Sequence, residues 1–99
     1  MKLRILPSAI EDLSDGSAFY ETQVEGLGSY FMESVFSDID SLKLYAGIHP
    51  KVFGYHRLLS KRFPYAIYYL KKSDTVSINA SLDCRRDPGW IREKFGQSG

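Results

Sequence analysis

The hydrophobic period of the chain changes near Pro50, and this change restricts the folds open to it. Before Pro50, apolar residues recur every three or four positions, which is the spacing of a helix buried on one side. After Pro50, apolar and polar residues alternate over short runs, which is typical of half-buried β-strands. The order of these segments predicts an α+β domain in which helices and a sheet form separate layers.

The first half predicts a short strand at residues 2–5 followed by a helix that begins near Pro7. Ser8 and Glu11 have the spacing of a capping box at the start of this helix. Gly16 weakens the helix by about 1 kcal/mol relative to alanine, so we expect a close contact or a kink there. The predicted apolar stripe consists of Ile10, Leu13, Ser17, Tyr20 and Val24.

A second helix is predicted from about Ser29 to Leu44, after a break that contains two glycines. Because the break is short, the two helices are expected to form an antiparallel hairpin. Gly47 has the position of a left-handed cap that ends the second helix. The predicted buried face consists of Phe31, Val35, Ile39 and Leu42, and Met32 and Phe36 widen it.

The second half predicts three strands, at about 56–61, 65–70 and 75–83, in an antiparallel meander. The third strand alternates cleanly, so its apolar residues Val76, Ile78, Ala80 and Leu82 are expected to face one core. A short C-terminal helix follows at 88–95, with Asp87 as its N-cap and Pro88 in its first turn. The expected fold is an N-terminal strand and a helical hairpin packed on one side of an antiparallel β-sheet, with the short helix at the end.

Composition indicates one ordinary globular domain that spans residues 1–99, with 43% hydrophobic and 25% charged residues. The N-terminal residues lack the apolar run of a signal peptide, and no stretch has the length of a membrane span, so we expect a cytoplasmic protein with no membrane partner. Cys84 is the single cysteine, and together with His49 and His56 it has no metal-ligand spacing. Neither a metal nor a cofactor is predicted. Cys84 itself is more typical of a small buried residue than of a nucleophile.

The two halves of the chain differ in charge. Residues 1–50 hold three basic and eight acidic residues, whereas residues 51–99 hold ten basic and four acidic ones. The segment 51–72 contains six basic residues, six aromatic residues and no acidic residue. This pattern indicates either a surface for an anionic partner or a solvated strand face balanced by acidic helices.

The candidate site lies where the first and third strands of the meander end. Lys61, Arg62, Arg85 and Arg86 are expected to converge there, with Arg57 on the first strand and Trp90 beside them. Guanidinium groups suit phosphate oxygens, and an aromatic ring offers a face to an unstacked base. The alternative is that Arg85 and Arg86 pair with Asp83 and Asp87 in a surface network. Cleavage of RNA would also need an acid and a base, for which the candidates are His56, Asp83, a tyrosine or a lysine with a shifted pKa.

Five segments together resemble the RelE/ParE superfamily of toxins from bacterial type II toxin–antitoxin modules, which are also known as addiction or plasmid stabilisation modules. They are PSAIEDL (7–13), FYE (19–21), GLGSYF (26–31), KRFPYAIYY (61–69) and CRRDPGW (84–90). The resemblance covers nearly the whole chain. It implies a helical hairpin against an antiparallel sheet, a cognate antitoxin that neutralises the toxin, and arrest of growth.

The resemblance leaves the target open between two branches of this superfamily. One branch cleaves ribosome-bound mRNA with basic sheet residues and an acid–base residue near the C-terminus, and the other inhibits DNA gyrase. Arg86 matches an arginine of the nuclease pattern, and Arg57 or His56 falls near a strand lysine. Ala66, however, replaces a sheet arginine, and Trp90, which has no titratable proton, stands near the expected tyrosine. These departures favour a non-nuclease target slightly, and a protein-interaction module without toxicity is a further alternative.

The aromatic content bears on the antitoxin. Aromatic residues make up 14% of the chain, which is more than one small core accommodates. We therefore expect an apolar groove over the helical hairpin and the sheet edge, covered by an antitoxin segment that folds on binding. Burial of four aromatic residues, with no apolar groove left over, would contradict this expectation; they are Tyr20, Tyr30, Phe36 and Tyr45.

Overall fold

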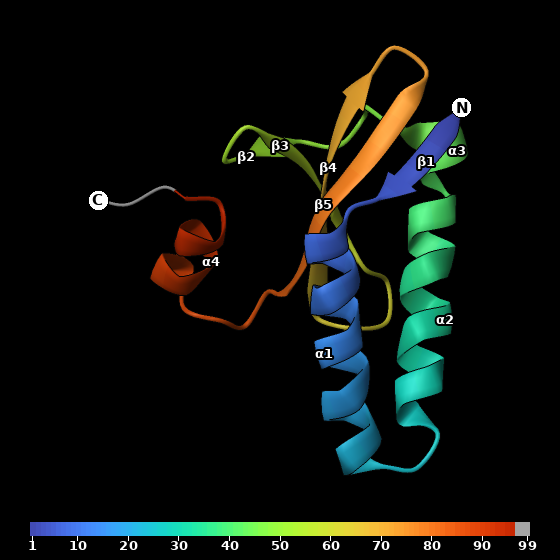
Figure 1. Cartoon of the computed structure of the whole chain (residues 1–99), viewed down its shortest axis with the longest axis vertical. Helices are drawn as coiled ribbons and strands as arrows, with labels where there is room; N and C mark the ends of the chain where they lie inside the picture. Colours follow the sequence, from blue (N-terminus) through green and yellow to red (C-terminus); the bar gives the residue numbers. More distant parts are fainter. Residues whose placement is uncertain (97–99) are drawn as a thin grey trace.

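The computed structural model of the protein describes residues 1–96. Figure 1 shows α1 and α2 side by side as a hairpin, while the short α4 stands apart from them. The α+β class, the hairpin and the C-terminal helix are confirmed. The elements in chain order are β1 (Lys2–Ile5), α1 (Pro7–Gln23), α2 (Leu27–Asp40), α3 (Leu42–Tyr45), β2 (Lys51–Val52), β3 (Tyr55–Leu59), β4 (Tyr65–Lys72), β5 (Thr75–Asp83) and α4 (Pro88–Lys94).

The predicted capping box at the start of α1 is wrong. The helix begins at Pro7, and its N-cap is Leu6, which makes no side-chain capping bond. Pro7 suits the first helical position because it has no N–H to satisfy there. Ser8 is therefore already inside the helix, and its hydroxyl donates to the carbonyl oxygen of Asn79 on β5, 2.8 Å away.

The buried side of α1 differs from the predicted stripe. Leu13 and Tyr20 are buried as expected, but Ile10 and Val24 are exposed, and the small residues Ala9 and Gly16 face the core instead. A Cβ atom on Gly16 would lie 2.8 Å from the Phe31 Cζ atom of α2. The close contact predicted at Gly16 is confirmed, and the small side of α1 lets the second helix approach.

The second helix is divided at Ser41 into α2 and α3, although the sequence predicts one helix. Its predicted central stripe is confirmed, because Phe31, Val35, Ile39 and Leu42 are all buried. Of the two residues expected to widen this face, Met32 is half-buried, but Phe36 is exposed. Glu21 closes the turn between α1 and α2: its carboxylate accepts from the backbone N–H groups of Gly26 and Gly28, each at 2.9 Å. Gly47 has φ +98°, as expected of a left-handed cap after the helix.

The sheet has five strands in the order β1-β5-β4-β3-β2. The meander β3-β4-β5 is antiparallel as predicted, but β1 pairs with β5 in parallel, so the sheet is mixed. The two-residue strand β2 at the other edge was not predicted. Alternation of polar and apolar residues identifies a strand but does not show whether it runs parallel or antiparallel to its neighbour. Here the chain passes through the helical hairpin after β1, a long connection of the kind that parallel strands need.

A register shift between Tyr68 and Tyr69 changes which face the residues of β5 occupy. Tyr69 pairs with Ile78 and Tyr68 with Ala80, so that Asn79 is an extra residue in β5. Val76 and Ile78 pack against the helical hairpin, whereas Ala80 and Leu82 pack on the opposite face. The prediction that all four face one core is therefore wrong, because the bulge reverses the alternation halfway along the strand.

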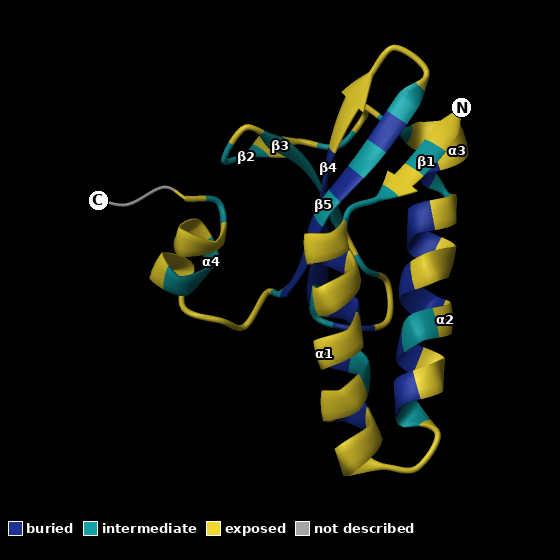
Figure 2. Ribbon diagram, in the orientation of Figure 1, coloured by how far each residue is buried: buried dark blue, intermediate teal, exposed yellow. Residues whose placement is uncertain are grey.

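Each face of the sheet has its own apolar cluster. The larger one lies between the sheet and the α1–α2 hairpin, and Figure 2 shows its buried residues along the inner sides of both helices. The smaller one lies under α4, where Trp90, Ile91 and Phe95 cover Ala66 and Tyr68. The helices are thus not all on one side of the sheet. Within residues 1–96, every helix is too short or too polar to span a bilayer.

Candidate functional site

The ends of β3 and β5 lie at the same end of the sheet, as the sequence predicts. Leu59 of β3 pairs with Ala66, and Asp83 of β5 pairs with Tyr65 one position away on β4. The segment that carries Lys61 and Arg62 and the segment that carries Arg85 and Arg86 both start from this end. Their side chains, however, go to three different places.

Arg85 forms a two-pronged ion pair with Asp83. Its Nε donates to Asp83 Oδ1 at 3.0 Å, and its Nη2 donates to Asp83 Oδ2 at 2.8 Å. The Arg85 guanidinium holds the pKa of Asp83 below its usual value, and Asp83 raises the pKa of Arg85 in return. For Arg85 the predicted surface pairing is confirmed, and Asp83 is a carboxylate whose basicity is reduced.

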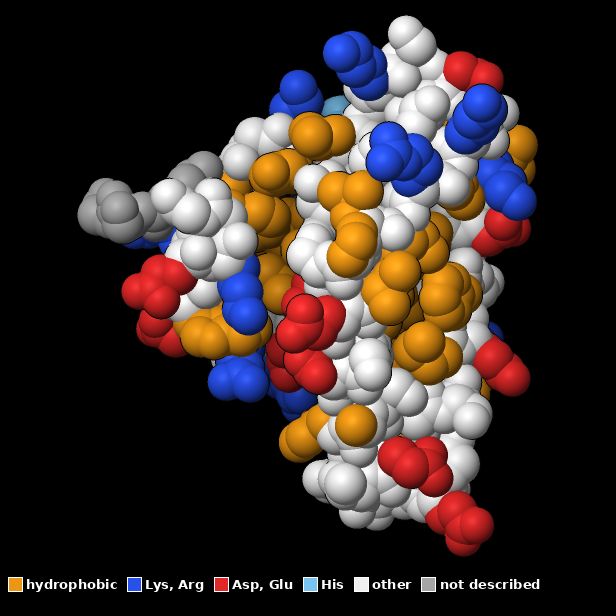
Figure 3. Space-filling view, in the orientation of Figure 1, with side chains coloured by type: hydrophobic (Ala, Val, Ile, Leu, Met, Phe, Trp, Pro, Cys, Tyr) orange, Lys and Arg blue, Asp and Glu red, His pale blue; other side chains and the backbone are white. Residues whose placement is uncertain are grey.

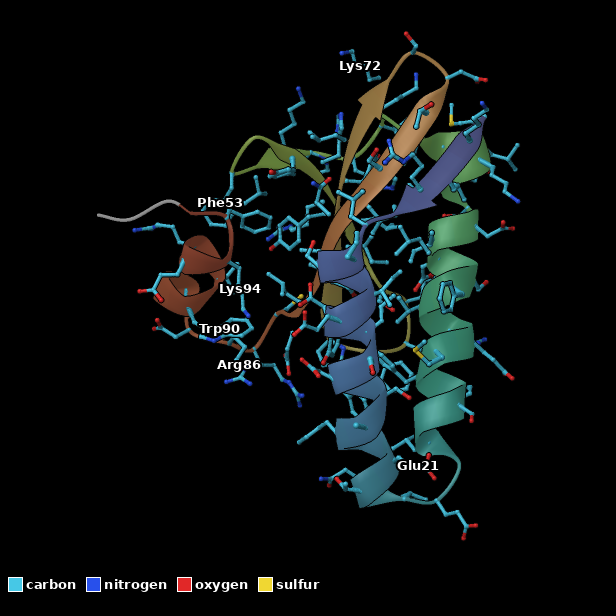
Figure 4. The ribbon with its side chains drawn as sticks, in the orientation of Figure 1. Glu21, Phe53, Lys72, Arg86, Trp90 and Lys94 are labelled. Carbon is cyan, nitrogen blue, oxygen red and sulfur yellow. The ribbon has the colours of Figure 1, made fainter. Side chains whose placement is uncertain are left out.

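Arg86 goes to Trp90 and not to Asp87. Its Cζ lies 4.6 Å from the centre of the Trp90 ring, and Lys94 Nζ lies 4.8 Å from the same ring. Asp87 instead caps α4 as predicted, because its carboxylate accepts from the N–H groups of Gly89 and Trp90. Figure 4 shows the side chains of Arg86, Trp90 and Lys94 together at α4. The predicted proximity of Arg86 and Trp90 is therefore present, as a cation–π contact.

A cleft of about 330 Å³ separates this cationic row from α1. Asp12, Asp15 and Phe19 of α1 line one wall, and Arg86, Trp90 and Lys94 line the other. Figure 3 shows acidic side chains over α1 beside basic side chains over α4. A ligand in this cleft would meet carboxylates on one side and cations stacked on indole on the other.

Asp12 connects the cleft to the bulged strand. Its Oδ2 accepts from the backbone N–H of Ser81 at 3.1 Å. Burial raises the pKa of Asp12, and the Ser81 N–H and the charge of Lys94 oppose this rise. Neither Asp12 nor Lys94 was singled out from the sequence. The spacing of Arg86, Trp90 and Lys94, four residues apart each time, is the signal that would have identified Lys94.

His56 and Arg57 are on opposite faces of the sheet. The His56 ring stacks on Tyr69 with ring centres 5.0 Å apart, and its Nδ1 lies 2.7 Å from the carbonyl oxygen of His49. His56 therefore faces the helical hairpin. Tyr69, its neighbour on β4, lies four residues from Tyr65, so His56 is roughly 13 Å along the sheet from the end that carries Arg86.

Arg57 pairs with Tyr68 and lies on the face that α4 covers. Its Nε is buried and has no hydrogen-bond partner among the described residues. Burial raises the pKa of the Tyr68 hydroxyl, and the Arg57 guanidinium opposes that rise. Ala66, which stands at the position of a sheet arginine in the resemblance, is buried on the same face.

The segment of Lys61 and Arg62 contacts α2. The backbone N–H of Lys61 donates to Asp38 Oδ2 at 3.3 Å, and Arg62 Cζ lies 5.9 Å from the centre of the Tyr30 ring. The side chains of Arg62, Arg85 and Arg86 therefore contact three different residues and do not converge as predicted. Cys84 is exposed, which differs from the buried residue expected. Within residues 1–96, no three or more histidine, cysteine or carboxylate side chains gather as a metal site.

No protein-family model matches the chain, and neither does any curated protein sequence. A solved structure does match, described as the chromosomal ParDE TA system from P. aeruginosa, where TA denotes toxin–antitoxin. The TM-score is 0.73 at 19% sequence identity, and the match covers 84% of this chain and 95% of the other. This chain therefore shares its fold with a chain of that ParDE system. At this identity the similarity establishes the fold, and it is the same fold that the sequence motifs imply.

Proposed function

We propose that the chain is the toxin of a toxin–antitoxin pair, which arrests growth until a cognate antitoxin binds it. The fold carries this proposal, since nearly all of a chain from a ParDE toxin–antitoxin system superimposes on this one. The sequence motifs at 7–13, 26–31 and 84–90, which resemble RelE/ParE toxins, lie in α1, at the start of α2 and at the start of α4.

Exposed apolar side chains on the helices support an antitoxin partner. Tyr20 is buried, but Tyr30, Phe36 and Tyr45 are 44%, 40% and 54% exposed. Between α1 and α2, Ile10, Ala18 and Met32 line an open groove, and Figure 3 shows apolar side chains gathered between the two helices. An antitoxin segment that folds along this groove would cover Ile10, Ala18 and Met32.

For the target we propose DNA gyrase, and through it DNA replication, rather than ribosome-bound mRNA. The residues that an RNA-cleaving site needs are dispersed: His56 faces the hairpin, and Asp83 is paired with Arg85. The row of Arg86, Trp90 and Lys94 offers positive charge and an aromatic ring, but it contains no histidine or carboxylate. This arrangement supports binding of a target more than acid–base chemistry.

The proposal is tested by inducing the chain alone and together with the product of the neighbouring reading frame. We expect growth arrest in the first case and growth in the second. Pulse labelling then separates the targets: DNA synthesis should fall before protein synthesis. Protein synthesis that collapses within minutes while DNA synthesis continues would instead indicate the mRNA endoribonuclease. Absence of arrest would indicate a non-toxic interaction module.

The basic side of the cleft is tested in the same assay. Arg86→Ala should relieve the arrest, because it removes an exposed guanidinium and leaves the fold intact; surface substitutions change stability by about 0.5 kcal/mol or less. Arg92→Ala is the matched control, an exposed arginine of α4 that does not line the cleft. Equal toxicity of both variants would remove Arg86 from the mechanism, and unfolding of Arg86→Ala alone would make it a structural residue.

A further inference from the structure

One half of the sheet face opposite the helical hairpin is uncovered. On that face α4 packs over Ala66, Tyr68, Ala80 and Leu82, which belong to the half of β4 and β5 beyond the bulge. The other half consists of β1, the start of β5 and the end of β4, around the turn at Ser73 and Asp74. Figure 1 shows this end of the sheet projecting away from α4.

Strand alternation identifies the side chains on this bare half. Leu3, Val76 and Tyr69 pack in the cluster under the hairpin, so their neighbours point to the opposite face. The register places these neighbours in two rows: Lys2 beside Thr75 beside Lys72, and Arg4 beside Ser77 beside Leu70. We call this set of six residues the bare basic face.

The cations of the bare basic face have no counter-ion in the protein. Lys2, Arg4 and Lys72 are exposed, and among the described residues none of them forms an ion pair. Asp74, the nearest acidic residue in the turn, lies 3.5 Å from the N-terminal ammonium of Met1. Figure 3 shows basic side chains gathered at this end of the molecule, and Figure 4 places Lys72 at its tip.

The geometry of the bare basic face suits a phosphate backbone. Two residues of strand separate Lys2 from Arg4 by about 7 Å, and two strand spacings separate Lys2 from Lys72 by about 10 Å. Lysine, arginine, serine and threonine are the side chains that contact phosphate oxygens in complexes with DNA. The face offers no aromatic ring, and binding of single strands depends on stacking of bases on such rings. These features favour a duplex, held by its backbone and without choice of sequence.

We propose that the bare basic face binds the phosphate backbone of double-stranded DNA. The choice of DNA over duplex RNA rests on the proposed function, which places the target in DNA replication. The face is at the opposite end of the sheet from Arg86 and Trp90, so one molecule can contact DNA through β1 and β4 while its cleft remains free.

The test measures binding of the full-length chain, made by cell-free synthesis, to a short fluorescent DNA duplex by anisotropy. Between about 50 and 200 mM salt, the slope of log affinity against log salt should be shallower by about 2.7 in Lys2→Ala/Arg4→Ala/Lys72→Ala, at about 0.9 for each lost phosphate contact. The control, Lys43→Ala/Lys51→Ala/Lys71→Ala, removes the same charge. In it, Lys51 and Lys71 pair with His56 and Val76 on the hairpin side of the sheet.

The proposal holds if the control changes the slope by less than about 1 and the single variants Arg4→Ala and Lys72→Ala each change it by about 0.9. Equal loss in both triple variants would overturn it, because binding would then follow net charge alone. Tighter binding to a single strand, or equal binding to duplex RNA, would also overturn it. Growth arrest plays no part in this assay, so its result is separate from the fate of the toxin proposal.

Discussion

Arg85 and Arg86 are adjacent in the sequence, but their side chains have different partners. Arg85 donates two side-chain hydrogen bonds to Asp83, whereas Arg86 lies on the Trp90 ring and stays exposed. The alternation of side chains at the end of β5 separates them, since Asp83 faces Tyr65 and the hairpin while Arg86 continues toward α4. Of the two, Arg86 is the one whose donors are available to a target.

The Asp83–Arg85 pair makes stability depend on pH. The pKa of Asp83 is lower in the folded protein than in the unfolded chain, so the pair stabilises the fold above the unfolded pKa of about 3.9 and loses this effect as the pH falls through the folded value. Asp83→Asn should lower the free energy of unfolding by about 1 kcal/mol or less near neutral pH, because Arg85 is largely exposed.

Urea unfolding of both proteins from near neutral pH down through the acid range checks this. The difference between Asp83→Asn and the parent protein should be constant near neutral pH and should vanish below the folded pKa of Asp83. Glu33→Gln, at an exposed carboxylate of α2 that forms no ion pair within residues 1–96, serves as the control. A difference that persists in acid would show that the amide itself, and not the loss of the ion pair, destabilises the variant.

At the scale of elements, the close packing of α1 against α2 depends on Gly16 and Gly28. A Cβ atom on Gly28 would lie 2.6 Å from the backbone carbonyl oxygen of Ser17, which cannot move without bending α1. Gly28→Ala should therefore lower the free energy of unfolding by about 1–3 kcal/mol, the usual cost of overpacking. Ser14→Ala, at an exposed position of α1, should leave stability unchanged or raise it slightly. Equal Tm values of Gly28→Ala and Ser14→Ala in thermal unfolding would contradict this prediction, because α2 could then move away from α1 without loss of stability.

The helices and strands follow from local sequence patterns, but the layer that each side chain faces does not. The helices, the meander strands and the Asp87 cap were predicted because each depends on residues close in sequence. The bulge at Asn79 was not, since Val76 to Leu82 alternates without interruption, while these apolar residues pack on the hairpin before the bulge and under α4 after it. When a strand packs on a layer at each face, alternation alone does not say which residues face which layer.

The candidate site, like the fold, was predictable only where it depends on residues close in sequence. Arg86 and Trp90 meet because they are four residues apart at the start of α4. Arg62 does not join Arg86, because its guanidinium lies near the ring of Tyr30, and the backbone N–H of Lys61 donates to Asp38; both partners lie far earlier in the sequence, on α2. Such long-range contacts leave no signal in the local sequence. The same reason explains why Asp12, on α1, was not expected to hold the backbone of β5.

At the scale of the whole molecule, the open groove between α1 and α2 is the surface that the proposed antitoxin would cover. Its lining includes both apolar and polar residues, and Ile10, one of the apolar ones, is 54% exposed. A partner that binds the folded chain and not the unfolded one stabilises it by about 4 kcal/mol at a thousand times its dissociation constant. For a domain of this size, each kcal/mol raises the Tm by roughly 4–8 °C, so an antitoxin should raise it by roughly 15–30 °C.

This rise in Tm should depend on the groove between α1 and α2. Ile10→Lys places a charge where the antitoxin segment would pack, so the antitoxin should raise the Tm of this variant by far less than that of the parent protein. Ile48→Lys makes the same change at a residue that is 72% exposed in the loop after α3 and outside the groove lining. Differential scanning fluorimetry of each chain, alone and with the neighbouring gene product, gives both values. If the antitoxin raises the Tm of Ile10→Lys and Ile48→Lys by equal amounts, whether small or large, the partner does not bind in this groove.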